Sequence, residues 1–129
     1  MTVRFLGNAD PAVVSVALDG VANECSESHV RLGPRVSRLG RTVICVPAAG
    51  LEALATTIGR ATSDLGDPPD PRPFRGHVTL ARLRRRAACG LAGTPYSDEF
   101  LADEMHLVQS TTRREGAEHR RLRRWSLGA

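Results

Sequence analysis

The sequence has 129 residues, a length typical of a single domain. Hydrophobic residues make up 41% and charged residues 25%, which excludes a disordered tail, a collagen-like chain and a disulfide-dense miniprotein. No apolar run is long enough to cross a bilayer, and the first residues lack the pattern of a secretory signal. The three cysteines are widely spaced and odd in number, which indicates reduced thiols and a cytoplasmic protein: Cys25, Cys45 and Cys89.

The charge is unevenly distributed. All 18 basic residues are arginines, and the net charge is +4. Residues 72–129 hold twelve of these arginines against six acidic residues. A basic half favours a polyanionic partner, and phosphate is the first candidate because the planar guanidinium can bind it through two hydrogen bonds. The alternative, which composition alone leaves equally open, is a solvated basic surface that reflects a bias towards arginine.

The first half of the chain carries strand and helix patterns in turn. Residues 2–6 alternate in polarity and predict a short strand. Asp10 and Pro11 then have the residue types of a helix N-cap and first turn. Two more strands and an amphipathic helix ended by a glycine follow, at residues 28–32, 41–46 and 51–65.

The second half begins with a connection that is stiffened by four prolines, over residues 67–76. A strand over 77–83 follows, and residues 84–97 are expected to be irregular. Residues 104–110 and 117–125 then predict a closing antiparallel pair. This order of elements predicts an α+β fold.

His77 and Thr79 are the clearest candidates for chemistry. Alternate residues of a strand project to the same face, so these two side chains would lie together while Val78 and Leu80 pack into the core. An imidazole can give or take a proton near neutral pH, and a hydroxyl can hold a phosphoryl oxygen. On spacing alone, a purely structural histidine remains the alternative.

The segment around these residues resembles a known motif. Residues 72–82, Arg-Pro-Phe-Arg-Gly-His-Val-Thr-Leu-Ala-Arg, are similar to the second His-x-Thr motif of the two-histidine (2H) phosphoesterases. More narrowly, they resemble the bacterial RNA 2′,3′-cyclic phosphodiesterases, also called the 2′-5′ RNA ligase family. Residues 2–7 are similar to the end of the first motif, and residues 105–110 to a late strand ending in serine. Residues 116–127 resemble the closing strand, with His119 where the family usually has tyrosine.

The resemblance implies a two-lobed α+β fold, with antiparallel sheets around a central cleft and one His-x-Thr strand from each lobe. A single domain over 1–129 would then consist of the remainder of the first lobe with its helix (1–66), the proline-rich connection (67–76) and the second-motif and closing strands (77–129). The family's first histidine would fall immediately before Met1, so the first lobe is expected to be truncated. Either the natural chain extends upstream, or half of the catalytic pair is missing.

The activity that the resemblance implies is hydrolysis of RNA 2′,3′-cyclic phosphate ends to 2′-phosphomonoesters, without a metal or other cofactor. His77 would carry one proton transfer, and Thr79 and Thr2 would bind phosphate oxygens. Arg82 matches the family's arginine five residues after the histidine. Strict alternation turns Arg82 away from His77, so it requires a bulge or a strand end to reach the site. Arg4, which would share a strand face with Thr2, is a further candidate phosphate ligand.

The expected partners are RNA ends or small cyclic nucleotide phosphates, with no membrane and no obligate protein partner. A second hypothesis is a catalytically impaired remnant that binds RNA or phosphate, and a third is a fragment without function. Under the second hypothesis, arginine runs would hold an RNA backbone in a salt-dependent way, at residues 84–86, 113–114 and 120–124. The scattered histidines and cysteines make a zinc site only a minor alternative.

Overall fold

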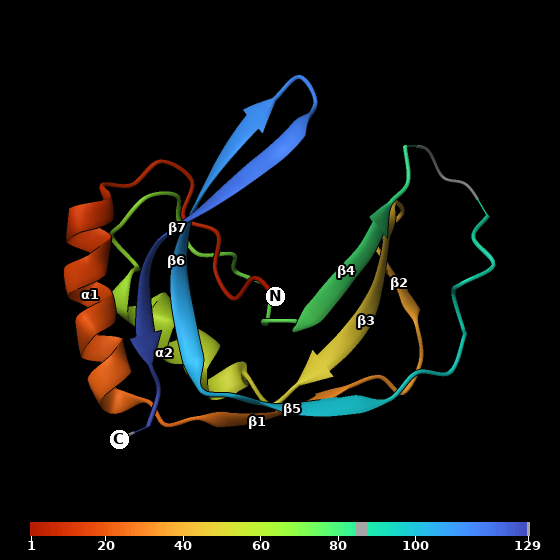
Figure 1. The fold of residues 1–129 in the computed structure, drawn as a ribbon, viewed down its shortest axis with the longest axis horizontal. Coiled ribbons are helices and arrows are strands. Elements are labelled where there is room, and N and C mark those ends of the chain that lie inside the picture. The colour runs from red at the N-terminus through yellow and green to blue at the C-terminus, as the bar shows by residue number, and fades with distance from the viewer. Residues whose placement is uncertain (85–87, 129) are drawn as a thin grey trace.

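The computed structural model describes residues 1–84 and 88–128, which form two parts joined at one end (Figure 1). One part contains the helices α1 (Pro11–Glu24) and α2 (Glu52–Ala61) and the hairpin β6 (Glu104–Arg113) and β7 (Gly116–Ser126). The other part contains β2 (Ser37–Leu39), β3 (Val43–Ala49) and β4 (His77–Arg82). The strands β1 (Ser28–Leu32) and β5 (Asp98–Ala102) pair with each other and connect the two parts.

The sheets are antiparallel throughout. The larger sheet has five strands in the order β2-β3-β1-β5, with β4 on the other edge of β3. The hairpin β6–β7 forms a separate two-stranded sheet whose pairing continues almost to its turn at residues 114–115. The predicted α+β fold and closing pair are therefore confirmed, and neither helix in the described ranges is long and apolar enough to cross a membrane.

Local sequence signals place the helices. The Asp10 carboxylate accepts a hydrogen bond from the Ala12 N–H at 2.9 Å, so α1 begins where the Asp-Pro pair predicts. The second helix is shorter than predicted, because it ends at Ala61 and not near Leu65. The Thr62 hydroxyl donates to the Ile58 carbonyl at 2.7 Å at this end. The chain then turns back towards the N-terminal segment.

The predicted strand over residues 2–6 is wrong. In place of a strand partner, this segment meets the loop after α2: the Leu6 carbonyl accepts from the Asp67 N–H at 2.7 Å. Gly66 has φ +67° there, and a Cβ on it would overlap the Leu6 carbonyl oxygen, so the close approach requires glycine. A loop cannot supply a repeating ladder of hydrogen bonds. Val3 and Leu6 nevertheless pack against the core, as their apolar character requires.

Two short strands have no clear sequence signal. Residues 98–102, Asp-Glu-Phe-Leu-Ala, lack alternation, yet they form β5 because the edge of β1 pairs with them from Ser28–Ala102 to Leu32–Asp98. Likewise, β2 forms on the edge of β3. In both cases the neighbouring strand determines the structure, and intrinsic propensity does not.

The hydrophobic core consists of two apolar clusters, one in each part. The larger lies between the helices and the hairpin, and its buried residues include Val14 and Leu18 of α1, Ile58 of α2, and Trp125 of β7. The Trp125 Nε1–H donates to the Asp19 carboxylate at 2.7 Å, which ties the hairpin to α1. The smaller cluster lies on one face of the β2–β3–β4 sheet. Its buried members are Val36, Ile44 and Val46.

Candidate active site

The strand β4 presents His77 and Thr79 on one face, as strand alternation predicts. In the pairing with β3, His77 lies opposite Pro47 and Thr79 opposite Cys45. Pro47 and Cys45 are two residues apart on β3, so they share a face, and their partners on β4 share the same face. The imidazole and the hydroxyl are therefore neighbours on the surface of this sheet.

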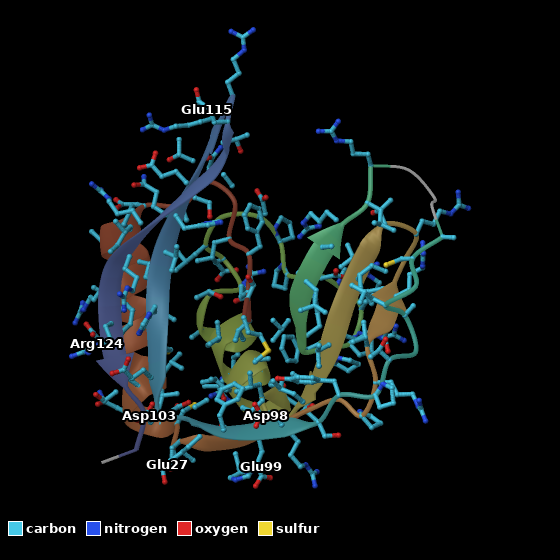
Figure 2. The ribbon with its side chains drawn as sticks, turned by 45° about the vertical axis from the view of Figure 1, so that its right-hand side comes forward. Glu27, Asp98, Glu99, Asp103, Glu115 and Arg124 are labelled. Atoms are coloured by element: carbon cyan, nitrogen blue, oxygen red, sulfur yellow. The ribbon has the colours of Figure 1, made fainter. Side chains whose placement is uncertain are left out.

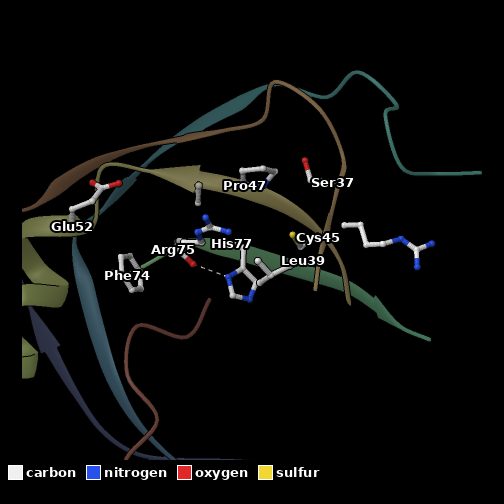
Figure 3. Close-up of a pocket in the computed structure, with 11 residues that line it drawn as sticks. Ser37, Leu39, Cys45, Pro47, Glu52, Phe74, Arg75 and His77 are labelled. Atoms are coloured by element: carbon white, nitrogen blue, oxygen red, sulfur yellow. Dashed lines mark hydrogen bonds between the residues drawn. The ribbon is translucent and has the colours of Figure 1, made fainter. Parts of the chain in front are cut away.

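A backbone contact orients the His77 ring. Its Nδ1 lies 2.7 Å from the carbonyl oxygen of Arg75 (Figure 3). A carbonyl oxygen can only accept a hydrogen bond, so Nδ1 carries the proton and donates it. The neutral ring therefore has its lone pair on Nε2, and Nε2 is the atom that can take or give a proton.

The register between β3 and β4 shifts after Thr79. Ile44 pairs with Ala81, whereas the next residue, Cys45, pairs with Thr79. Leu80 is thus left without a partner on β3, which makes it the extra residue of a β-bulge. Every residue of β4 after the bulge lies on the face opposite to the one that strict alternation predicts.

The bulge brings Arg82 to the face of His77. Arg82 pairs with Val43, which lies on the same face of β3 as Cys45 and Pro47. The structure thus supplies the bulge that the sequence analysis requires for this arginine. Three polar side chains of one short strand then share a single face: an imidazole, a hydroxyl and a guanidinium.

The bulge also accounts for the exposure of a residue that was predicted to lie in the core. Leu80, predicted to be in the core, is 50% exposed because it has lost its place in the alternation. Val78, which was also predicted to pack into the core, precedes the bulge and pairs with Val46 of the smaller cluster, but it is only half-buried.

A pocket of 330 Å³ opens beside His77 (Figure 3). This volume lies at the lower end of the range for small-molecule sites. It offers the aromatic ring of Phe74, the guanidinium of Arg75 and the carboxylate of Glu52, which also accepts a hydrogen bond from the Gly50 N–H at 2.9 Å. The remaining lining residues come from β2, from β3 and from the segment that leads into β4: Ser37, Arg38, Leu39, Cys45, Pro47, Ala48 and Gly76.

Few of the residues that line the pocket belong to a pattern that the sequence reveals. Phe74 and Arg75 stand inside the segment that resembles the 2H motif, so a signal for them was present. Ser37 and Leu39 lie on β2, whose place beside β3 no local pattern indicates. Cys45 is buried, and burial raises the pKa of its thiol.

The side chain of Arg4 is hydrogen-bonded to other residues of this chain. Its Nε donates to the Thr62 hydroxyl at 3.0 Å, and its Nη2 donates to the carbonyls of Thr62 and Asp67 at 3.3 and 2.8 Å. The guanidinium thereby binds the end of α2 and the following loop. The inference that Arg4 shares a strand face with Thr2 is wrong, because the segment is not a strand.

Thr2 is exposed. The N-terminal end of the chain lies between the two parts of the molecule in Figure 1, and the N-terminal segment runs towards His77 in Figure 3. The N-terminal segment therefore runs from the opposite part towards the face of β4 that carries His77.

Two of the other histidines each pair with a single side chain. His106 Nε2 lies 3.0 Å from the Glu104 carboxylate, and His119 Nδ1 lies 2.9 Å from the Ser110 hydroxyl. Across the described ranges, no three histidine, cysteine or acidic side chains come together as a metal site would require. The arginines at 85 and 86 fall outside the described residues.

Comparisons with known proteins identify the fold. No family model and no curated protein sequence matches the chain. Among solved structures, a phosphoesterase matches with a TM-score of 0.80, 22% identity, and coverage of 99% of this chain and 76% of that chain. Escherichia coli LigT complexed with 3′-AMP matches with a TM-score of 0.79, 22% identity and the same coverage. The protein TT0787 of Thermus thermophilus matches with a TM-score of 0.75, 22% identity, and coverage of 98% and 76%. The chain therefore has the 2H phosphoesterase fold, as the sequence resemblance predicts.

Proposed function

We propose that this chain, with its 2H phosphoesterase fold, opens the 2′,3′-cyclic phosphate of RNA ends to a 2′-phosphomonoester. One observation carries the proposal: the bulge at Leu80 aligns His77, Thr79 and Arg82 on one face of β4, beside a pocket large enough for a small ligand. These three side chains supply a proton carrier, a hydrogen-bond donor and a fixed positive charge, which are the groups that phosphate-ester hydrolysis uses.

The chemistry requires two proton transfers. A water oxygen attacks phosphorus, the bond from phosphorus to the ribose 3′-oxygen breaks, and the 2′-oxygen keeps the phosphate. The attacking water loses a proton to a base, and the departing 3′-oxygen gains a proton from an acid. The Nε2 atom of His77 performs one of these transfers, since Nδ1 is held by the Arg75 carbonyl.

The side chains of Thr79 and Arg82 stabilise the negative charge of the phosphate oxygens. The Thr79 hydroxyl donates to a phosphoryl oxygen, and the Arg82 guanidinium binds the charge that builds up on the phosphate oxygens in the transition state. Thr2 is a further candidate ligand, from the opposite part of the molecule. Arg4 is not included, because its Nε and Nη2 already donate to hydroxyl and carbonyl oxygens of this chain.

The pocket suggests where the rest of the substrate lies. Structures of E. coli LigT contain 3′-AMP, NADP⁺ or ATP, all of which are nucleotide phosphates. We place a nucleotide in the present pocket, with its phosphate towards His77 and its nucleoside beside Phe74 and Arg75.

The proposal is tested by hydrolysis of 2′,3′-cyclic AMP in the presence of a metal chelator, with the products separated by chromatography. His77→Ala is expected to lower the rate by about 10²–10⁴-fold, the usual contribution of one acid or base. The matched control is His29→Ala, which removes an exposed histidine from β1 and is expected to leave the rate unchanged. An active His77→Ala variant, formation of the 3′-phosphate, or inhibition by the chelator would contradict the proposal.

A second variant addresses the other proton transfer. Placing a histidine immediately before Met1 adds the group that the sequence resemblance expects in the first motif. If the 129-residue chain binds the cyclic nucleotide without turning it over, this extended chain is expected to gain activity that depends on His77. Tight binding with no turnover in either chain would instead favour the alternative of a phosphate- or RNA-binding remnant.

A further inference from the structure

The hairpin β6–β7 continues far beyond the core. Its base is buried through Met105 and Trp125, whereas residues 108–121 are exposed on both faces. We name these fourteen residues the arm. In Figures 1 and 2 the arm projects beyond the rest of the molecule, with Glu115 at its tip. A two-stranded ribbon of this kind buries little surface of its own, so its exposed side chains are available to a partner.

The arm is basic. It carries four arginines and two glutamates, and one of each is used in the pair between Arg113 and Glu118 at 2.5 Å. The guanidinium groups of Arg114 and Arg120 have no hydrogen bond or ion pair with any described residue. Arg121 has none either, but its charge attracts the Glu104 carboxylate and helps to lower the pKa of that group. Arg120 and Arg121 are neighbours on a strand and therefore point to opposite faces, so both faces of the arm present positive charge.

The composition of the arm restricts the partner. It has no phenylalanine, tyrosine or tryptophan on which a base could stack, and its one imidazole, His119, is hydrogen-bonded to Ser110, so bases are not its main target. Its only large apolar side chain is Val108, which is too little to insert into a bilayer. The arm thus presents guanidinium groups but no side chain suited to base stacking or to insertion into a bilayer. Such a surface is suited to binding the phosphates of a nucleic-acid backbone.

The position of the arm relates it to His77. The arm rises at the end of the molecule where β4 ends, and that end of β4 carries Arg82 (Figures 1 and 2). His77 begins the same strand, and five residue steps of strand span roughly 17 Å. If the terminal phosphate of an RNA lies at His77, the last nucleotide alone does not reach the arm. Several nucleotides that precede the terminus are needed to span this distance.

We propose that the arm docks the sugar-phosphate backbone of a single-stranded RNA whose terminal phosphate occupies the His77 site. The location of that terminus rests on the proposed function, whereas the charge of the arm does not. The chain then binds an oligonucleotide more tightly than a mononucleotide, without preference for sequence, and the added affinity falls with salt.

The test measures binding of a fluorescein-labelled RNA of about 12 nucleotides that ends in a 3′-hydroxyl, by anisotropy at salt concentrations from about 50 to 200 mM. This RNA has no cyclic phosphate, so the result is independent of turnover. In Arg120→Gln/Arg121→Gln, affinity at low salt is expected to fall about tenfold. The slope of log affinity against log salt is expected to decrease by about 1.4, or about 0.7 for each lost phosphate contact.

The control is Arg31→Gln/Arg60→Gln, which removes the same charge from β1 and α2 and is expected to bind within about twofold of the parent chain. A single Arg114→Gln variant, at the turn, provides a smaller effect of the same sign should the double variant unfold. Equal losses in the arm and control variants would overturn the proposal, since only net charge would then matter. Unchanged binding in the arm variants would overturn it as well, as would retention on phosphatidylserine vesicles that RNA does not displace.

Discussion

His77 and Arg82, five residues apart on β4, lie on the same face of the sheet because Leu80 between them has no partner on β3. A regular strand would turn these two side chains to opposite faces. The bulge is therefore the feature that allows one strand to offer both a proton carrier and a positive charge to a phosphate.

Removing the bulge tests this relationship. Deletion of Leu80 removes the extra residue, so Ala81 and Arg82 keep Ile44 and Val43 as partners and Arg82 stays on the face of His77 in regular alternation. Turnover of the cyclic nucleotide is expected to be retained in the deletion variant, because the charge keeps its place, and to fall by about 10²-fold in Arg82→Ala, which removes that charge. Circular dichroism establishes that the deletion variant is folded.

Arg31→Ala serves as the control, since it removes an exposed arginine from β1. It is expected to retain the activity of the parent chain. Full activity in Arg82→Ala, or loss of activity in a folded deletion variant, would contradict the role given to the shared face.

Thr62 and Arg4 are expected to act on stability. Thr62 is completely buried, accepts from Arg4 at 3.0 Å and donates to Ile58 at 2.7 Å. Thr62→Val keeps the volume but removes both hydrogen bonds, so urea denaturation should reveal a loss of about 1–3 kcal/mol. Thr56→Val is the matched control, because its exposed hydroxyl caps only the Glu52 carbonyl on the same helix, and a smaller loss is expected.

Arg4→Gln distinguishes a structural arginine from a phosphate ligand. The free energy of unfolding is expected to fall, since three hydrogen bonds to Thr62 and Asp67 are disrupted. The KM for the cyclic nucleotide is expected to be unchanged below the unfolding temperature. A raised KM in a chain of undiminished stability would instead assign Arg4 to the substrate.

Glu104 makes the base of the hairpin sensitive to acid. A hydrogen bond from His106, with added attraction from Arg124, holds the pKa of this carboxyl below its ordinary value. The ionised form is thus favoured in the folded state, so its contribution to stability is present above the ordinary glutamate pKa and is lost as the pH falls through the lowered value. Glu104→Gln should have a lower Tm than the parent chain at pH 7, and the difference should vanish in strongly acidic solution. Glu115→Gln, at the exposed tip of the arm, should match the parent chain at both pH values.

Cys45 is expected to resist alkylation. Its side chain is buried and burial raises its pKa, so the reactive thiolate forms only at higher pH in the folded chain. Iodoacetamide at about pH 8 should therefore modify the half-buried Cys25 and Cys89 first, as read by peptide mass spectrometry. All three thiols should react at similar rates in urea. Rapid modification of Cys45 in the native chain would contradict this burial.

The features that depend on local chemistry could be predicted from the sequence. Asp10 and Pro11 start a helix because a side-chain oxygen and a fixed φ satisfy the first turn without help from the rest of the chain. His77 and Thr79 share a face because strand geometry alone places alternate residues together.

The positions of two arginines could not be predicted from the sequence, because they depend on partners that are distant in the chain. The face of Arg82 follows from the pairing of β4 with β3, which leaves Leu80 out of register. The role of Arg4 follows from the loop after α2, whose carbonyls reach it across about sixty residues of sequence. Hydrogen-bond partners that are distant in sequence leave no periodic trace in it, so only the folded chain assigns these two arginines to their places.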